Sequence, residues 1–276
     1  MPFLKNLDNA MKDTIRSHIP TGCPWGENMH IFDSIDSTNT RLKEMARAGA
    51  PEGTVLLAHS QTGGRGRLGR SFHSPPSKGI YFSLLLRPDL PAAKLMHLTC
   101  AVGVAVCNAV ETVMQFRPGI KWINDLVAGK QKAGGILTEL SIDPAGKVAY
   151  AVIGIGINCS HKREDFPAEL QDIATSLEAF TGKECDQSKL VAELIIGLYK
   201  MNTVLISGKA EVMAQYRKDC ITVGKEIQVI RDQTCKPGLA LDVLEDGQML
   251  VRYPDGTEEP VDSGEVSIRG MYGYIS

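Results

Sequence analysis

The sequence has little that indicates a disulfide framework or a cysteine-bound metal. Its seven cysteines are scattered singly, no two of them form a Cys-x-x-Cys pair, and no His-rich segment supplies metal-ligand spacing. An odd number of separated cysteines is typical of reduced thiols in the cytosol rather than of a secreted, disulfide-bonded domain. We therefore expect free thiols and a cytoplasmic location.

Long hydrophobic runs are also missing. The first 20 residues lack the apolar core of a secretory signal. The longest apolar stretch, residues 95–106, contains His97, Thr99 and Cys100 and is too short to cross a bilayer. We expect a soluble protein without a membrane partner, in which this stretch is a buried helix.

An excess of positive charge, which DNA-binding proteins need, is absent as well. The chain has 30 Lys and Arg against 32 Asp and Glu, so any phosphate binding must be local. Residues 1–28 have room for one short helix, which leaves no space for a helix-turn-helix domain. DNA is therefore not an expected partner.

The pattern from residue 29 onward predicts a sheet covered by helices. Apolar runs of strand length recur: 30–35, 55–59, 80–86 and 150–157. Helices are expected at these ranges: 39–48, 92–114 and 188–206. A strand at 120–127, a turn and a second strand at 133–140 form a hairpin signal.

After Cys220 the pattern changes to short alternating segments separated by Asp-Gly turns, with no helix between them. Strands are expected at these ranges: 226–230, 239–243, 249–253 and 266–268. Closely spaced strands of this kind indicate a small β-barrel. The predicted division is a short N-terminal segment (1–28), a catalytic domain (29–219) and a C-terminal barrel (220–276).

The segment at 61–70, Gln-Thr-Gly-Gly-Arg-Gly-Arg-Leu-Gly-Arg, is the most distinctive feature. Glycines let backbone N–H groups approach an anion, and arginines add forked donors for phosphate or carboxylate. The alternative interpretation is a mobile surface turn with solvated arginines. The segment is not a Walker loop, because no Gly-Lys-Ser/Thr follows, and its spacing does not fit a dinucleotide-binding fingerprint.

Three further segments are each weak signals alone. Asp36-Ser-Thr-Asn39 can bind a polar group or cap a helix. The second is Lys121-Trp-Ile-Asn-Asp125, followed by Lys132. Its Asp can hold Mg²⁺ near a phosphate and its Lys can bind an anion, or the two can be a turn residue and an exposed lysine of a hairpin. The glycines of Gly154-Ile-Gly-Ile-Asn158 can end a binding strand or merely relieve packing.

The order and spacing of these segments together resemble the biotin–protein ligase family over about residues 30–269. An ending at 264–269, Gly-Glu-Val-Ser-Ile-Arg, adds to the likeness. The resemblance implies an α+β fold, with a mixed sheet, flanking helices and a small C-terminal SH3-like β-barrel. Two departures are Ile123, where the family usually has proline, and Phe72, often tryptophan.

The resemblance also implies an activity: an ATP-dependent, AMP-forming ligase makes biotinyl-5'-AMP and transfers biotin to a lysine of a biotin carboxyl carrier protein. Lys132, Arg67 and Arg65 would be catalytic. Asp125 would hold Mg²⁺. Residues implied around biotin are Ser37, Thr38, Asn39, Gln61, Arg65, Gly66, Arg67 and Lys132. Residues implied around ATP are Arg67, Asn124, Lys132 and Asn158.

Two other functions stay open at this stage. A lipoate–protein ligase shares the fold, although the Gly/Arg loop and the terminal barrel favour biotin. A non-enzymatic biotin-binding regulator is the second alternative. The resemblance is compatible with a monomer or a homodimer, and the sequence does not identify the carboxylase that supplies the acceptor lysine.

Overall fold

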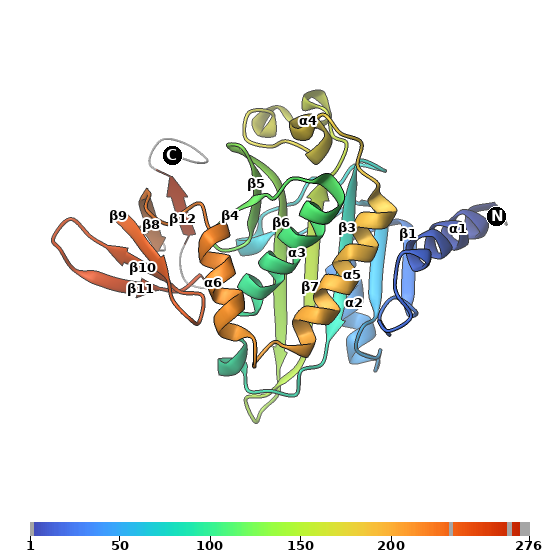
Figure 1. The fold of residues 1–276 in the computed structure, drawn as a ribbon, viewed down its shortest axis with the longest axis horizontal. Coiled ribbons are helices and arrows are strands. Elements are labelled where there is room, and N and C mark those ends of the chain that lie inside the picture. The colour runs from blue at the N-terminus through green and yellow to red at the C-terminus, as the bar shows by residue number, and fades with distance from the viewer. Residues whose placement is uncertain (1–2, 232–233, 264–266, 271–276) are drawn as a thin grey trace.

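The computed structural model describes residues 3–231, 234–263 and 267–270. The chain forms one large sheet and a smaller one (Figure 1). The large sheet contains these strands: β1 (Met29–Ile35), β2 (Val55–Gln61), β3 (Gly79–Leu86), β4 (Gly119–Lys121), β5 (Asp125–Ala128), β6 (Gln131–Ile142) and β7 (Val148–Asn158). The described helices are α1 (Phe3–Ser17), α2 (Thr38–Arg47), α3 (Leu98–Met114), α4 (Leu177–Thr181), α5 (Gln187–Thr203) and α6 (Lys209–Asp219).

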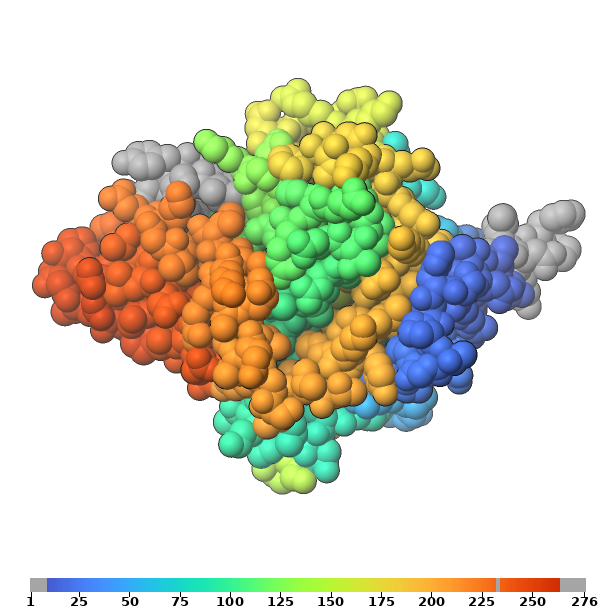
Figure 2. Space-filling model, in the orientation of Figure 1, coloured from blue at the N-terminus to red at the C-terminus, as the bar shows by residue number. Residues whose placement is uncertain are grey.

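The seven strands of the large sheet have the order β1-β2-β3-β7-β6-β5-β4. Strands β1 and β2 are parallel, and the other neighbouring pairs are antiparallel. The predicted mixed sheet with flanking helices is therefore confirmed. Helices α3, α5 and α6 lie across one face of the sheet (Figure 1), and the space-filling view shows them packed side by side over it (Figure 2).

Strand β3 shows that both faces of the large sheet are covered, because all eight residues of this strand are buried. Ile80, Phe82 and Leu84 belong to the main core, to which α3 and α5 contribute. Leu85 faces the opposite way, into a smaller core with Leu42 of α2. A strand buried on both faces appears in the sequence as a continuous apolar run, which is why the pattern predicted it.

The apolar run 92–114 is inside the protein. By length and composition it could cross a membrane, but 72% of its most apolar window is buried in the fold. The prediction of one continuous helix was wrong: a 3₁₀ turn at Ala92–Leu95 precedes α3. At the junction, buried His97 has its Nε2 2.8 Å from the carbonyl oxygen of Leu205.

The expected strand 120–127 is also divided, into β4 and β5. Between the two strands, Asn124 is hydrogen-bonded to Ile136 of β6. The side-chain Nδ2 of Asn124 donates to Ile136 O at 2.8 Å, and the backbone oxygen of Asn124 accepts from Ile136 N at 2.9 Å. Helix α6 was not predicted. Its sequence is largely polar, and Met213 and Tyr216 are the buried apolar residues that attach it.

The smaller sheet is antiparallel, in the order β11-β10-β9-β8-β12. Its strands are β8 (Glu226–Arg231), β9 (Thr234–Val243), β10 (Met249–Arg252), β11 (Glu258–Val261) and β12 (Ser267–Gly270). This sheet is consistent with the predicted SH3-like domain, although β11 was not expected. Residues 264–266 of the family-like ending lie outside the described residues, and the division at residue 220 stays a prediction.

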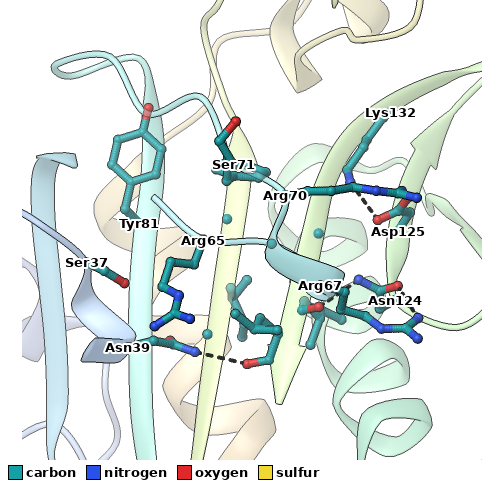
Figure 3. Close-up of a pocket in the computed structure, with 18 of the residues that line it drawn as sticks. Ser37, Asn39, Arg65, Arg67, Arg70, Ser71, Tyr81, Asn124, Asp125 and Lys132 are labelled. Carbon is teal, nitrogen blue, oxygen red and sulfur yellow. Dashed lines mark hydrogen bonds and ion pairs between the residues drawn. The ribbon is translucent and has the colours of Figure 1, made fainter. Parts of the chain in front are cut away.

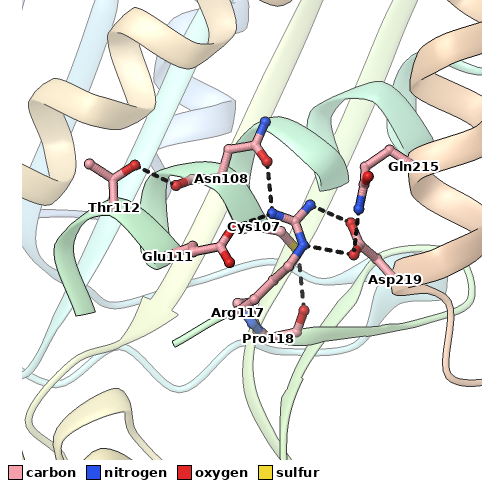
Figure 4. A network of polar contacts seen from close by, with 8 residues as sticks. All are labelled: Cys107, Asn108, Glu111, Thr112, Arg117, Pro118, Gln215 and Asp219. Atoms are coloured by element: carbon pink, nitrogen blue, oxygen red, sulfur yellow. Dashed lines mark hydrogen bonds and ion pairs between the residues drawn. The ribbon is translucent and has the colours of Figure 1, made fainter. Parts of the chain in front are cut away.

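A polar network connects the end of α3 to the end of α6 (Figure 4). Arg117 donates from Nε and Nη2 to the two carboxylate oxygens of Asp219, at 2.7 and 2.6 Å. Its Nη1 donates to Glu111 Oε2 at 2.7 Å and to Asn108 Oδ1 at 2.8 Å. The network therefore fixes the point from which the chain continues into the smaller sheet.

We predict that Asp219→Ala lowers the free energy of unfolding by about 2 kcal/mol, because the Arg117 guanidinium loses a bidentate partner in a largely buried site. The two side chains are only 5% and 23% exposed. Urea denaturation measures the change. Asp172→Ala is the control, since its pair with Arg163 is 83% and 66% exposed, and it should cost less than about 0.5 kcal/mol. Equal small losses in both variants would contradict the prediction.

Candidate active site

A cavity of about 500 Å³ lies on the face of the large sheet that carries α2, beneath the Gly/Arg loop (Figure 3). Strands β3, β7 and β6 form its floor. Tyr81 of β3 is paired with Gly156 of β7, which is paired in turn with Gly135 of β6. The floor therefore includes two glycines side by side, Gly135 and Gly156, where side chains from other elements can lie directly on the strand backbone.

Two glycines of β7 create the space above this floor. A Cβ atom at Gly154 would lie 2.2 Å from Oδ1 of Asn39, and one at Gly156 would lie 2.6 Å from the ring of Phe72. Real Cβ atoms do not approach other atoms so closely. These glycines are therefore required for the amide and the ring to lie over the sheet.

One end of the cavity is polar but uncharged. Ser37 is the N-cap of α2, and its Oγ accepts from the backbone N–H of Thr40. Thr38 donates from its backbone N and Oγ1 to Oε1 of Gln61, at 2.9 and 3.1 Å, and Gln61 Nε2 donates to Ser74 Oγ at 3.0 Å. The two interpretations of Ser-Thr-Asn are thus compatible, because Ser37 caps the helix and also lines the cavity.

The amide of Asn39 is held from both sides. Ser83 Oγ donates to its Oδ1 at 2.6 Å, and its Nδ2 donates to Glu139 Oε2 at 2.9 Å and to Leu137 O at 3.2 Å. Lys43 pairs with Glu139 at 2.7 Å. Neither Ser83 nor Glu139 was predicted from the sequence. The signal for Ser83 was available, since it is the only polar residue in the run 80–86 apart from the Tyr81 hydroxyl.

The Gly/Arg loop folds back on itself and extends over the cavity. Arg65 is bridged to Ser71, and Gly66 N donates to Arg70 O at 2.7 Å. Leu68, at the tip, is 60% exposed. The loop is therefore an ordered hairpin-like turn with a side chain directed away from the protein.

Arg67 connects the loop to two other parts of the fold. Its Nη1 donates to Asn124 Oδ1 at 3.1 Å, and its Nη2 donates to the carbonyl oxygen of Ser263, beyond the smaller sheet's β11. Burial lowers the pKa of the Arg67 guanidinium below its ordinary value, while the nearby charge of Asp125 opposes this change. The guanidinium of an arginine stays protonated at neutral pH. Arg67 therefore provides a positive charge that is partly removed from water.

The other end of the cavity is charged. Lys132 Nζ lies 2.6 Å from Asp125 Oδ1, across the β5–β6 hairpin (Figure 3). The backbone of Lys132 is fixed as well: its N–H donates to Ile173 O at 2.8 Å, and its carbonyl accepts from Thr175 N at 2.9 Å. A lysine on a fixed backbone with a carboxylate beside it can meet an anion in a defined place.

The structure brings most predicted site residues together, although it does not test their individual roles. The cavity is lined by Ser37, Thr38, Asn39, Gln61, Arg65, Gly66, Arg67, Asn124, Asp125 and Lys132. Asn158 is not among the lining residues. It is buried at the end of β7, and its Nδ2 donates to Thr175 O at 2.9 Å. Contact between Asn158 and a nucleotide stays a prediction.

Comparison with known proteins identifies the family. A family model described as "Biotin/lipoate A/B protein ligase family" matches residues 31–158. The bifunctional ligase/repressor BirA of Bacillus spizizenii is 33% identical over 235 residues, which make up 85% of this chain and 72% of that protein. The chain belongs to the biotin protein ligase family.

Further relatives agree with this assignment. A biotin–[acetyl-CoA-carboxylase] ligase of Paracoccus denitrificans is 35% identical over 242 residues, with 85% of this chain and 98% of that protein covered. The biotin protein ligase of Aquifex aeolicus, solved in complex with biotin and ATP, has a TM-score of 0.75 and 30% identity, covering 88% of this chain and 99% of that one. The predicted family and fold are confirmed.

In this member of the family, the segment after β7 contains a histidine in an apolar setting. His161 is 1% exposed, its ring stacks on Phe166 with centroids 4.9 Å apart, and neither ring nitrogen has a partner in the part of the chain that the structure describes. Burial, the nearby His73 and the charge of Lys78 lower the pKa of His161 to about 4, against the opposing charge of Asp165.

We predict that stability falls as the pH drops from 6.5 toward 4. The unfolded His161 takes up a proton near pH 6.5 and the folded one only near pH 4, so its contribution is fully present above pH 6.5 and declines by about 3 kcal/mol toward pH 4. Urea denaturation at several pH values checks this. His161→Leu should have a shallower pH dependence than the wild type, and parallel curves for the two proteins would refute the assignment.

Proposed function

We propose that this chain activates biotin with ATP to biotinyl-5'-AMP and then transfers biotin to a lysine of a biotin carboxyl carrier protein. The observation that carries the proposal is a cavity with an uncharged polar end, at residues 37–39 and Gln61, and a cationic region formed by Arg65, Arg67 and Lys132. A ring with amide-like groups suits the first part. A carboxylate and phosphates suit the second part.

The chemistry requires these cations. When the biotin carboxylate attacks the α-phosphate, negative charge accumulates between two anions while pyrophosphate leaves. Arg65, Arg67 and Lys132 would offset that charge in the transition state, and their effect increases where water is excluded. Asp125 pairs with Lys132 at 2.6 Å, so the lysine already lies beside a carboxylate oxygen and would meet an anionic ligand in the same place.

The Gly/Arg loop would protect the product of this step. A mixed anhydride is hydrolysed readily in water, and a loop lying over the cavity keeps it from solvent until an acceptor arrives. The amine of the acceptor lysine then attacks the acyl carbon, an amide bond forms, and AMP leaves with the electron pair of the broken bond. No thiol nucleophile is required. Burial raises the pKa of Cys100 and Cys107, as in inert core thiols.

The site also fits Mg²⁺ carried on the phosphates. Asp125 is the carboxylate that lines the cavity, and the described residues contain no group of three or more His, Cys, Asp or Glu placed to hold an ion. Mg²⁺ is commonly held by one or two carboxylates together with substrate phosphates. Asp125, with the amide of Asn124 beside it, would hold the ion, which neutralises phosphate charge when bound.

The alternatives are less well supported. The family model includes lipoate ligases, but the relatives from Paracoccus denitrificans and Aquifex aeolicus are biotin ligases by name. A regulator without catalysis would not require the arginines and the lysine to converge on one cavity. The carrier protein served, the absence of DNA binding, the cytoplasmic location and the choice between monomer and homodimer stay predictions.

The decisive experiment is pyrophosphate exchange into ATP with biotin, with lipoate or with neither acid. We expect exchange only with biotin, because labelled pyrophosphate enters ATP by attacking an acyl-adenylate, and that adenylate forms only when the enzyme has bound an acid that it can activate. Labelled pyrophosphate recovered in ATP is the measurement. Equal exchange with lipoate would favour the related ligase, and binding of biotin without exchange would favour a regulator.

We predict that Lys132→Ala and Arg67→Ala each reduce biotin-dependent exchange by about 10²–10³, as expected for loss of a charge that stabilises the transition state. Their thermal unfolding should change little, because both side chains are only partly buried. Lys130→Ala is the matched control, since it removes an exposed charge from the same hairpin. Normal exchange rates in the two site variants would show that their roles are assigned wrongly.

A further inference from the structure

Glu139 lies next to the uncharged end of the cavity but is not among the cavity's lining residues. It is on β6, two residues after Leu137, whose paired partner is Gly154. Its carboxylate accepts from Asn39 at 2.9 Å and pairs with Lys43 at 2.7 Å. The carboxylate of Glu139 therefore contacts two residues of α2: Asn39, which lines the cavity, and Lys43, one turn further along the helix.

The carboxylate of Glu139, together with the carbonyl oxygen of Leu137, sets which way the Asn39 amide faces, and Glu139 makes the shorter and charged contact. An ionised carboxylate has only acceptors, so the NH₂ group of Asn39 must be directed toward it. Burial opposes ionisation of Glu139, but hydrogen bonds from Lys43 and Asn39 and the charges of Lys43 and Arg65 outweigh burial and hold its pKa below the ordinary value. The carboxylate is therefore ionised at neutral pH.

The donors of Asn39 are thus occupied. One N–H donates to Glu139 and the other to Leu137 O. Its Oδ1 accepts from Ser83 at 2.6 Å, and since an amide oxygen has two lone pairs, it retains the capacity to accept one more hydrogen bond. In this orientation, the amide can offer a ligand an acceptor and no donor.

We propose that Glu139 is a positioning residue for the ligand ring: by fixing the Asn39 amide, it makes the site select a ring that carries an N–H group. This inference rests on the proposed function, in which that ring is the ureido ring of biotin. The dithiolane ring of lipoate has no N–H and could not use the acceptor. The same carboxylate would thereby contribute to the choice of acid, without touching it.

The test compares Glu139→Ala, Glu139→Gln and Lys43→Met in the full-length chain. We expect Glu139→Ala to weaken biotin binding, measured by calorimetry, by about tenfold or more, the effect of losing a hydrogen bond to a charged group. The KM for ATP should not change. Glu139→Gln keeps an acceptor of nearly the same shape and should fall between wild type and Glu139→Ala, and it carries the test if the alanine variant does not fold.

Lys43→Met is the matched control, because it removes the ion pair and leaves the bond between Glu139 and Asn39. Its biotin affinity should stay within about threefold of wild type. Equal losses in Lys43→Met and Glu139→Ala, or a KM for ATP that rises together with the biotin dissociation constant, would reduce Glu139 to a structural role and overturn the inference.

A second readout concerns the N–H itself. Biotin analogues methylated at one or the other ureido nitrogen should bind the wild type less tightly, and for one of them this discrimination should shrink in Glu139→Ala. Unchanged discrimination against both analogues overturns the inference alone. Wild-type protein that fails to bind biotin overturns the proposed function, and the inference with it.

Discussion

A sheet surface can hold a ligand only where it carries no large side chains, and this constraint determines where the cavity lies. On the α2 face, Gly135, Gly154 and Gly156 add no side chain of their own to β6 and β7, so other groups can lie directly on the strand backbone. Asn39 and Phe72 occupy part of the space that the glycines create. The remaining space becomes the cavity, so the position of the site follows from missing side chains as much as from the residues that line it.

Charge is then concentrated where the sheet is open. The whole chain has a net charge of −2 and gives no general attraction for an anion. Five cations nevertheless line one cavity, and Asp125 and Glu139 compensate part of their mutual repulsion. The two carboxylates act in different places: Asp125 pairs with Lys132 at the charged end, and Glu139 accepts a hydrogen bond from the amide of Asn39 at the uncharged end.

The sequence predicted the residues of the loop, the Ser-Thr-Asn segment and the hairpin lysine, because each occurs in a short local pattern whose chemistry can be interpreted. It did not predict Glu139 or Ser83, which become relevant only through strand register. Ser83 and Leu137 are both paired with Gly154, and no local pattern reveals such a pairing. Asn158 shows what a local pattern leaves out, since a strand-end amide suggested a ligand contact and the fold adds a hydrogen bond from its side chain to Thr175 O.

The smaller sheet is part of the site's support rather than a separate appendage. Trp122, which lines the cavity, donates from Nε1 to Gly247 O at 2.9 Å and from its backbone N to Thr222 Oγ1 at 3.0 Å. Arg67 donates to Ser263 O. Two residues that line the cavity are thus held by carbonyl or hydroxyl oxygens beyond α6. The smaller sheet therefore contributes to the position of Arg67 and Trp122, although the cavity itself lies on the large sheet.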